Sequence, residues 1–442
     1  MMNVVSKAQY VSAESQEVKV EVESKSKRYK TLLGSVLGYA AEGLDMLLLS
    51  FVLMYILKEF HLTPAQGANL ILATTAGMLV GSYLFGFLAD LFGRIRTMAV
   101  SILLFSVATA LIYFATDYWQ LLFLRFLVGM GVGGEFGIGM AIVTETWSKN
   151  MRAKATSVVA LGWQFGVLVA SLLPALIVPY FGWRAVFLFG LIPALLAVYV
   201  RKSLSEPKLW EQKQQYKKQL QLKALQGTLT AEETRKWKNM KKFPLRKLFE
   251  NKKITMTTIG LIVMSFIQNF GYYGIFTWMP TILANKYGYT LAKASGWMFI
   301  STVGMLIGIA VFGFLADKIG RRKTFTLYYI GGTVYCLIYF FLLKDATLLL
   351  WGSALLGFFA NGMMGGFGAV LAENYPVEAR STAENFIFGT GRGLAGFGPV
   401  IIGLLASGGN LFGAMSLIFL IYPIGLITML VCVPETKGKA LD

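Results

Sequence analysis

Long apolar segments recur along most of the chain and are separated by short polar connections. We place twelve of them at residues 31–57, 66–92, 97–116, 118–144, 154–180, 183–200, 254–280, 293–316, 324–343, 346–372, 381–407 and 410–433. A helix of about 20 apolar residues crosses the hydrocarbon core of a bilayer. The pattern therefore predicts an all-α membrane protein with twelve transmembrane helices.

Polar stretches divide the chain into five parts. Residues 1–30 form a tail of mixed charge that lacks the apolar stretch and the cleavage site of a secretory signal. A Lys- and Gln-rich loop, 201–253, separates an N-terminal six-helix half, 31–200, from a C-terminal six-helix half, 254–433. Residues 434–442 form a second, shorter tail. The expected organisation is two halves joined by one long loop.

The long loop 201–253 has two possible roles. It is either a solvated linker, which we favour, or a regulatory element. In the second case residues 209–225 form a surface helix that lies against anionic lipid headgroups.

Composition and charge support a membrane protein and give its orientation. The chain is 56% hydrophobic and only 14% charged, which excludes a soluble enzyme. Its formal net charge is +18, and 34 of its 41 Lys and Arg residues fall in the two tails and the loops on one side of the predicted spans. Because positive loops stay in the cytoplasm, we expect both termini to be cytosolic in a multi-pass plasma-membrane protein. The positive charge then needs no nucleic-acid partner.

An internal repeat indicates that the two halves share one architecture. Residues 77–96 align with residues 304–323 at a shift of 227, with identical amino acids at 12 of 20 positions. A second match, at a shift of 228, pairs residues 145–152 with residues 373–380. Two structurally related halves are the simplest origin of both matches.

These motifs resemble those of the major facilitator superfamily of transporters. GFLADLFGR and GFLADKIGR are similar to its repeated cytosolic loop motif, RFLVGMGVGGE to its fourth-span motif, and VPETKG to the ending of its sugar-porter branch. EGLD at 42–45 and YYGIFTWMPTIL at 272–283 resemble aromatic-acid/proton symporters, whereas GGEFGIG and the stretch beginning GWRAVF resemble sialate and monocarboxylate symporters. The resemblance implies a monomeric, twelve-helix symporter of two pseudo-symmetric halves that carries a small organic anion and protons.

Few ionisable side chains lie within the predicted spans, and each costs at least about 2.5 kcal/mol to place there. The candidates for a functional role are Glu42, Asp45, Arg125, Glu135 and Arg392. Burial favours the neutral form of a carboxyl group and a nearby arginine favours its charged form. We expect one of the acids, Asp45 first, to carry the coupling proton together with Arg125, and Arg392 to attract the substrate anion. Static ion pairs that brace the helices are the alternative.

The repeat also suggests where the substrate binds. A shift of 227 carries Glu42 onto Asn269 and Asp45 onto Tyr272, so acids of the first half correspond to neutral hydrogen-bonding groups of the second. Besides Arg392, the expected substrate side comprises Gln268, Asn269, Tyr272, Tyr273, Trp278 and Asn361. Aromatic residues in membrane helices also serve as packing or interfacial anchors, which is the alternative for each of them.

The repeated loop residues have a predicted mechanical role. In the family resembled, this loop forms a cytosolic latch that is made when the cytosolic side closes. The implied gate residues are Asp90, Arg94, Asp317, Arg321, Glu145, Arg152, Glu373 and Arg380. A simple topology anchor of positive loops is equally compatible with these residues.

Glycine rows, such as Gly77/Gly81 and Gly304/Gly308, are expected to let helices approach where the halves slide. Span 5 lacks the GxxxGP pattern of many drug/proton antiporters, which disfavours an exporter of amphipathic compounds. A sugar-type porter is a further alternative. No catalytic or metal-binding cluster is readable in the sequence. We therefore expect a transporter without cofactor or metal, and not an enzyme.

Overall fold

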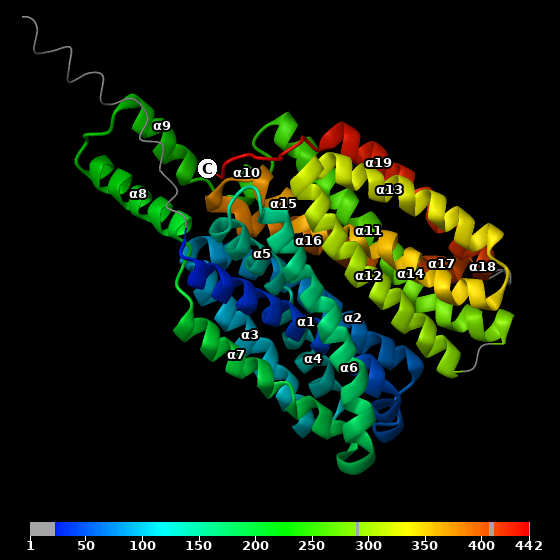
Figure 1. Ribbon diagram of the computed structural model, residues 1–442. Coiled ribbons are helices and arrows are strands. Elements are labelled where there is room, and N and C mark those ends of the chain that lie inside the picture. Colours follow the sequence, from blue (N-terminus) through cyan, green and yellow to red (C-terminus); the bar gives the residue numbers. More distant parts are fainter. Residues whose placement is uncertain (1–22, 289–290, 406–410, 442) are drawn as a thin grey trace, which may run out of the picture.

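The computed structural model describes residues 23–288, 291–405 and 411–441, and within these ranges it is built of helices without a strand (Figure 1). Residues 1–22 of the expected N-terminal tail and Asp442 of the expected C-terminal tail lie outside the described residues. Two helical bundles lie side by side, one formed by the earlier and one by the later part of the chain.

The first bundle contains the helices of the N-terminal part of the chain. They are α1 (Lys25–Glu59), α2 (Pro64–Phe92), α3 (Arg94–Leu111) with the short η1 (Ile112–Phe114), α4 (Tyr118–Val132), α5 (Glu135–Thr146), α6 (Arg152–Leu188) and α7 (Leu191–Ser203). Helices α4 and α5 follow each other across Gly133 and Gly134 and make one crossing. Within α6 the chain turns at Gly182, whose φ of 76° is left-handed, so two crossings adjoin there.

The second bundle repeats this plan. Its elements are α11 (Lys252–Tyr287), α12 (Leu291–Ile319), α13 (Arg321–Leu337) with η2 (Ile338–Leu342), α14 (Ala346–Gly362), α15 (Met364–Asn374), η3 (Val377–Ala379), α16 (Arg380–Ala395), α17 (Gly398–Leu405), α18 (Leu411–Ser416), η5 (Leu417–Leu420) and α19 (Ile421–Cys432). The loop between the bundles contains α8 (Lys208–Leu225), α9 (Ala231–Met240) and α10 (Pro244–Lys247).

The expected twelve crossings are confirmed. Eleven segments of the described chain are long and apolar enough to span a membrane, and one of them, Arg152–Ser203, has 52 residues and contains two crossings. Side-chain caps fix where several helices begin. Asp117 and Asp345 each accept two backbone N–H bonds at the first turns of α4 and α14, and Thr63 and Gln66 form a reciprocal capping box at α2.

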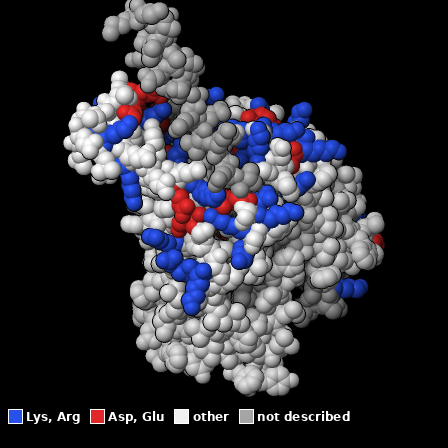
Figure 2. Space-filling view, turned by 60° about the vertical axis from the view of Figure 1, so that its left-hand side comes forward, with Lys and Arg blue, Asp and Glu red and all other residues white. Residues whose placement is uncertain are grey.

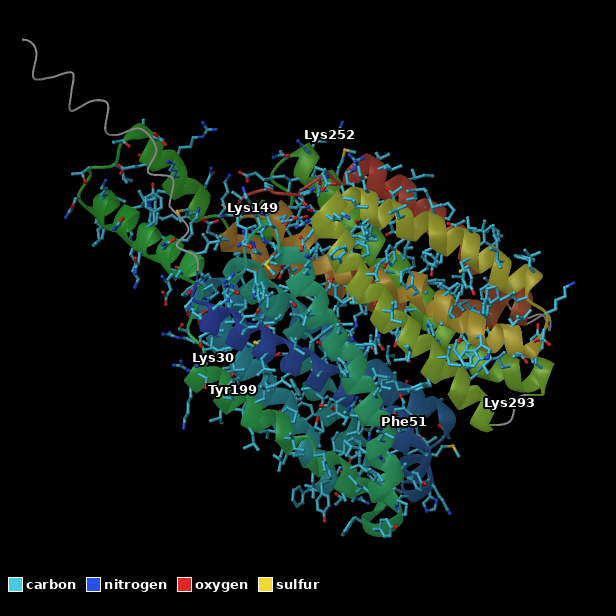
Figure 3. All side chains as sticks on the ribbon, in the orientation of Figure 1. Lys30, Phe51, Lys149, Tyr199, Lys252 and Lys293 are labelled. Carbon is cyan, nitrogen blue, oxygen red and sulfur yellow. The ribbon has the colours of Figure 1, made fainter. Side chains whose placement is uncertain are left out.

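Charged side chains gather at one end of the molecule, which Figure 2 shows as blue and red patches above largely uncharged flanks. This end also carries α8, α9, α10 and the end of the chain at residue 441 (Figure 1). Lys30, Lys149 and Lys252 lie there, whereas Lys293 lies at the opposite end (Figure 3). We call the charged end the latch end, because the ion pairs described below join the two bundles there.

The glycine rows occur inside each bundle and not between the bundles, which corrects the expectation that they form the sliding surface. A Cβ atom on Gly81 of α2 would lie 1.8 Å from the Met130 carbonyl oxygen of α4. A Cβ on Gly304 of α12 would lie 1.8 Å from the Ala354 carbonyl oxygen of α14. Because these helix backbones touch, each bundle is fastened internally.

A different pair of repeated glycines lies between the bundles. Gly86 on α2 faces Ser381 and Asn385 of α16, and Gly313 on α12 faces Ser157 of α6. Both belong to the GFLAD repeat, 227 residues apart. The bundles therefore approach each other through two equivalent helix pairs, α2 with α16 and α12 with α6.

Candidate functional site

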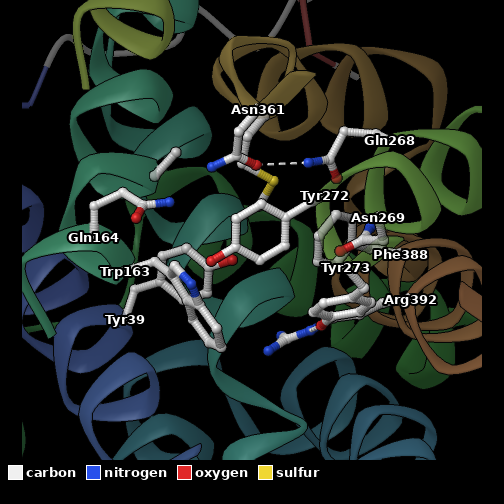
Figure 4. Close-up of a pocket in the computed structure, with 12 residues that line it drawn as sticks. Tyr39, Trp163, Gln164, Gln268, Asn269, Tyr272, Tyr273, Asn361, Phe388 and Arg392 are labelled. Carbon is white, nitrogen blue, oxygen red and sulfur yellow. Dashed lines mark hydrogen bonds between the residues drawn. The ribbon is translucent and has the colours of Figure 1, made fainter. Parts of the chain in front are cut away.

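A small cavity lies between the two bundles (Figure 4). The first bundle contributes Tyr39, Ala160, Trp163 and Gln164; the second contributes Gln268, Asn269, Tyr272, Tyr273, Asn361, Met364, Phe388 and Arg392. Six of the seven residues expected on the substrate side therefore share one cavity. The seventh, Trp278, is not among its lining residues, and its indole N–H donates to the Pro399 carbonyl at 2.9 Å.

Arg392 is the one cationic residue among the lining residues of this cavity. Its guanidinium carbon lies 4.4 Å from the ring centroid of Trp163, and its Nε donates to the hydroxyl of Tyr273 at 3.2 Å. Its Nη1 is paired with Glu42 of α1 at 2.5 Å, so this ion pair joins the bundles. Its Nη2 has no hydrogen-bond partner, which leaves a cationic donor for a ligand.

The opposite side of the cavity is polar but uncharged. Gln268 donates to the Asn361 side-chain oxygen at 2.7 Å (Figure 4), and Gln268 Oε1 has no partner. Asn269 is tied back to its own helix through the Ser265 carbonyl at 2.9 Å. Tyr39, Trp163, Tyr272, Tyr273 and Phe388 supply aromatic walls. The cavity thus offers a cation at one end, amides at the other and rings between them.

The acids of α1 lie just outside this cavity. Glu42 reaches Arg392 with one oxygen, and its second oxygen has no partner. Asp45, one helical turn further, accepts a hydrogen bond from Thr109 and lies 3.5 Å from Arg125 Nη1. Asp45 also lines a second, smaller cavity within the first bundle. The two acids therefore face different surroundings although they are three residues apart.

Glu135 begins α5 and is also fully buried. It accepts a hydrogen bond from Ser101 of α3, and its other carboxylate oxygen has no partner. A Cβ atom on Gly38 would lie 2.8 Å from that oxygen, so only a glycine on α1 leaves it room. Gly38 lies one turn before Glu42 on α1. The carboxyl group of Glu135, beside Gly38, is therefore followed along α1 by those of Glu42 and Asp45.

Two stacked rings close the cavity on the side of the latch end. Phe136 of α5 and Phe388 of α16 lie 3.8 Å apart between ring centroids, one from each bundle. Beyond them Asn385 accepts a hydrogen bond from the Gly137 amide at 3.2 Å. These contacts separate the cavity from the charged network at the latch end.

Asp90 joins the bundles at the latch end. Its carboxylate accepts the amides of Ser381 and Thr382 at 3.2 and 2.8 Å, at the start of α16, and pairs with Arg94 at 2.6 Å. Arg94 continues to Glu145 at 3.0 Å, and Glu145 pairs with Arg380 at 2.9 Å.

Asp317 makes the equivalent contacts from the second bundle. It accepts the amides of Ala153 and Lys154 at 3.2 and 3.0 Å, at the start of α6, and pairs with Arg321. Arg321 and Arg152 both bind Glu373, at 2.7 and 2.9 Å. The eight expected gate residues therefore form two related networks in which each bundle caps a helix of the other.

The comparison with protein families now identifies the fold. The model of the Major Facilitator Superfamily matches residues 35–343 and 293–441. The chain belongs to the major facilitator superfamily. It is therefore a membrane-embedded transporter and not an enzyme.

Curated relatives include proteins named as transporters of organic acids. The chain is 42% identical over 414 residues to a metabolite transport protein of Haemophilus influenzae, covering 94% of this chain and 98% of the relative. It is 30% identical to the niacin/nicotinamide transporter NiaP of Bacillus subtilis, covering 93% and 98%. It is also 30% identical to the cis,cis-muconate transport protein of Acinetobacter baylyi, covering 86% and 88%.

A solved member of the superfamily has the same fold. The proton:xylose symporter XylE bound to 6-bromo-6-deoxy-D-glucose superimposes with a TM-score of 0.76, covering 95% of this chain and 98% of XylE at 19% identity. This likeness concerns the fold alone. The cavity and both networks described above thus lie within the fold of the superfamily.

Two glutamates near the gate residues were not predicted from the sequence. Glu206 accepts the Arg94 and Ile95 amides at the start of α3, and Glu435 accepts the Arg321 amide at the start of α13. The glycines before these helices have φ of 115° and 107°. An alignment of LSEPK at 204–208 with VPETK at 433–437, at a shift of 229, would have found them.

Other functional residues were missed for different reasons. Tyr39, Trp163 and Phe388 look like ordinary aromatic residues in an apolar span, so only the tertiary structure brings them to the cavity. Gln164 is a polar residue in the predicted span 154–180 and was a readable signal. Glu384 lies in the predicted span 381–407 and belonged among the ionisable residues of the spans.

Proposed function

We propose that the protein imports a flat organic monocarboxylate, of the aromatic-acid type, together with protons, by alternating opening of the central cavity. The observation that carries this proposal is the cross-bundle pair of Arg392 and Glu42, at the edge of an aromatic cavity. A carboxylate ligand has a cation to bind, and its ring has aromatic faces to stack against. Niacin, named for one curated relative, is an acid of this class.

Substrate binding and proton binding are linked through Arg392. An incoming carboxylate competes with Glu42 for the guanidinium. Once displaced, Glu42 is a buried carboxylate without a cation, beside Glu135, and a buried unpaired charge is strongly disfavoured. Taking up a proton removes that cost. Anion and proton therefore enter the site together.

Asp45 and Arg125 extend this proton site into the first bundle. The Asp45 to Arg125 separation of 3.5 Å is long for an ion pair, and Arg125 Nε is held by Thr74 at 3.0 Å. A weakly paired acid is easier to protonate than a tightly paired one. We assign Asp45 as the first acceptor of the coupling proton, with Glu135 and Glu42 as its relay.

The orientation follows from the charges. Because positive loops stay inside, we place the latch end in the cytoplasm and the transporter, as a monomer, in the plasma membrane. The two networks then close the cytosolic side. In this state the cavity loads from outside, and the networks must break before the cargo is released.

Uptake into proteoliposomes tests the proposal. With an inward proton gradient, radiolabelled nicotinate or benzoate should accumulate, and sialate, lactate and xylose should accumulate less. Arg392→Gln removes a charge-assisted contact worth about 1.5–3 kcal/mol, so uptake should fall roughly 10- to 100-fold. Arg184→Gln, at an exposed pair with Glu59 away from the cavity, is the matched control.

A sugar-type porter is the second candidate. The uncharged amides Gln164, Gln268, Asn269 and Asn361 suit the hydroxyl groups of a neutral sugar. Xylose uptake that persists in Arg392→Gln, with no accumulation of any acid, would favour the sugar and overturn the anion.

A further inference from the structure

A carboxyl group at the latch end takes no part in the networks described above. Glu384 lies on α16, one turn after Arg380 and one turn before Phe388. Its residue is fully buried, and neither carboxylate oxygen has a hydrogen-bond partner. It lies between the stacked rings and the gate residues of the first network.

The charges around Glu384 already balance each other. The groups that face it are Arg380 on its own helix, Asp90 on α2, Arg94 at the start of α3 and Glu145 on α5. Arg94 binds both Asp90 and Glu145, and Arg380 binds Glu145. The two cations and two anions balance in charge, so an ionised Glu384 would be a fifth charge that is buried and has no partner.

Other charged groups on neighbouring elements are occupied elsewhere. Glu378 of η3 is paired with Lys247 of α10 at 3.6 Å, and Glu373 of α15 is paired with Arg321 at 2.7 Å. The backbone amides at the start of α16 are taken by Asp90. In the closed latch Glu384 therefore receives no hydrogen bond and no ion pair, and the hydroxyl of Ser381, one turn earlier on α16, has no partner either. The neutral form of Glu384 is favoured.

The first bundle provides an internal comparison. At the repeat shift of 228, Glu384 corresponds to Thr156 on α6. The Thr156 hydroxyl donates to the carbonyls of Arg152 and Ala153, at 3.1 Å each, and is satisfied in place. The fold of the latch therefore does not need a titratable group at this position, and only one of the two networks has one.

We propose that Glu384 is a proton-binding site of the gate, which must be occupied for the latch to close and is emptied when the latch opens. On opening, the contacts of Asp90 with α16 break and water reaches the carboxyl group, which releases its proton to that water and becomes a carboxylate. On closing it takes a proton from the same side. The site therefore adds nothing to the protons carried across the membrane, but it makes closure depend on pH at the latch end.

The direction of the pH dependence follows from the number of protons bound in each state of the latch. The closed state binds one more proton than the open state at this site, so acid at the latch end favours closure and alkali favours opening. The inference rests on the proposed function only in that the latch opens, and it does not depend on which substrate is carried. The test therefore uses no substrate, and a failure of the anion hypothesis would not affect it.

Spin labels across the latch measure the closed fraction directly. Lys149, between α5 and α6, and Lys252, at the start of α11, are exposed at the latch end on different bundles (Figure 3). We expect labels at Lys149→Cys and Lys252→Cys, with Cys432→Ala and protein in lipid nanodiscs, to give a short and a long distance. The short-to-long ratio should rise as pH falls.

Glu384→Gln isolates the contribution of this carboxyl group. Glu42, Asp45 and Glu135 titrate in both proteins, so the difference between the two slopes belongs to Glu384. The wild-type ratio should change by up to tenfold more per pH unit than the variant ratio, since one proton is involved. Glu232→Gln, at an exposed pair with Lys236, should keep the wild-type slope.

Equal slopes in the wild type and in Glu384→Gln overturn the proposal. Should the glutamine variant fail to fold, Glu384→Thr copies the residue of the other bundle and must give the same loss of slope. Infrared difference spectra supply a separate readout, because a protonated carboxyl band of the closed state must be present in the wild type and absent from the folded variant.

Discussion

Single carboxyl groups differ in this protein by their neighbours and not by their type. Glu42 is paired with the guanidinium of Arg392, Asp45 lies 3.5 Å from that of Arg125, and Glu384 has no hydrogen-bond partner. All three are buried on helices. At the scale of the residue, partner and solvent access distinguish the roles that we propose for these acids: a competitor for substrate, a proton carrier and a sensor of closure.

Asp45→Asn separates coupling from transport. The amide keeps the size of the side chain and the contact with Thr109, but it cannot bind or release a proton as a carboxyl group does. Accumulation driven by a proton gradient should be lost, whereas exchange of labelled for unlabelled substrate across the membrane should continue. Asp117→Asn is the control, because asparagine also caps the start of α4. Retained accumulation in Asp45→Asn would move the role to Glu135 or Glu42.

At the scale of the element, glycines decide which helices form rigid units. The close backbone contacts of α2 with α4 and of α12 with α14 lie within bundles, whereas the contacts between bundles use Gly86 and Gly313. A moving bundle needs firm internal packing and a separable interface. The distribution of glycine supplies both.

Two glycines on α12 make a matched test. A Cβ on Gly304 would lie 1.8 Å from the Ala354 carbonyl oxygen, whereas a Cβ on Gly296 meets its nearest atom, of Leu350, at 3.9 Å. Gly304→Ala should destabilise the protein by about 1–3 kcal/mol through overpacking. Gly296→Ala should be neutral or slightly stabilising. Thermal unfolding in detergent measures both, and equal midpoints would contradict the packing argument.

At the scale of the whole molecule, we propose that the two networks set the balance between closed and open latch. Each network caps a helix start of the opposite bundle with an aspartate, so the contacts are lost only when the bundles separate. Glu206 and Glu435 stay within their own halves, where they hold the starts of α3 and α13. The two networks are therefore the contacts that we expect to break when the bundles move apart.

Asp90→Ala should shift this balance toward the open latch. The change removes the acceptor for the Ser381 and Thr382 amides and leaves Arg94 with Glu145 and the carbonyls of Ala89 and Val377. Losing contacts worth about 1–3 kcal/mol corresponds to a roughly 5- to 150-fold change in the ratio of states. The Lys149→Cys/Lys252→Cys labels should report the longer distance. Glu250→Gln, at an exposed pair with Lys242, should leave the distances unchanged.

Much of this protein was determined by its sequence alone. Apolar runs of membrane length predict the twelve crossings because the bilayer admits few other spanning structures, and the repeat at a shift of 227 predicts two related halves. Arg392 and the acids of the spans stand out because charge in a membrane is costly. These are properties of local composition and spacing, which the sequence displays directly.

Contacts between distant segments were decided only by the tertiary structure. Trp278 donates a hydrogen bond to the Pro399 carbonyl and does not line the cavity, whereas Tyr39, Trp163 and Phe388 do. The glycine rows allow close contacts between helices inside each bundle and not between the bundles. Glu384 is set apart from the other buried acids by the lack of any hydrogen-bond partner on either oxygen. An aromatic ring, a glycine or a carboxyl group takes its role from the surface packed against it, and that surface comes from residues far away along the chain.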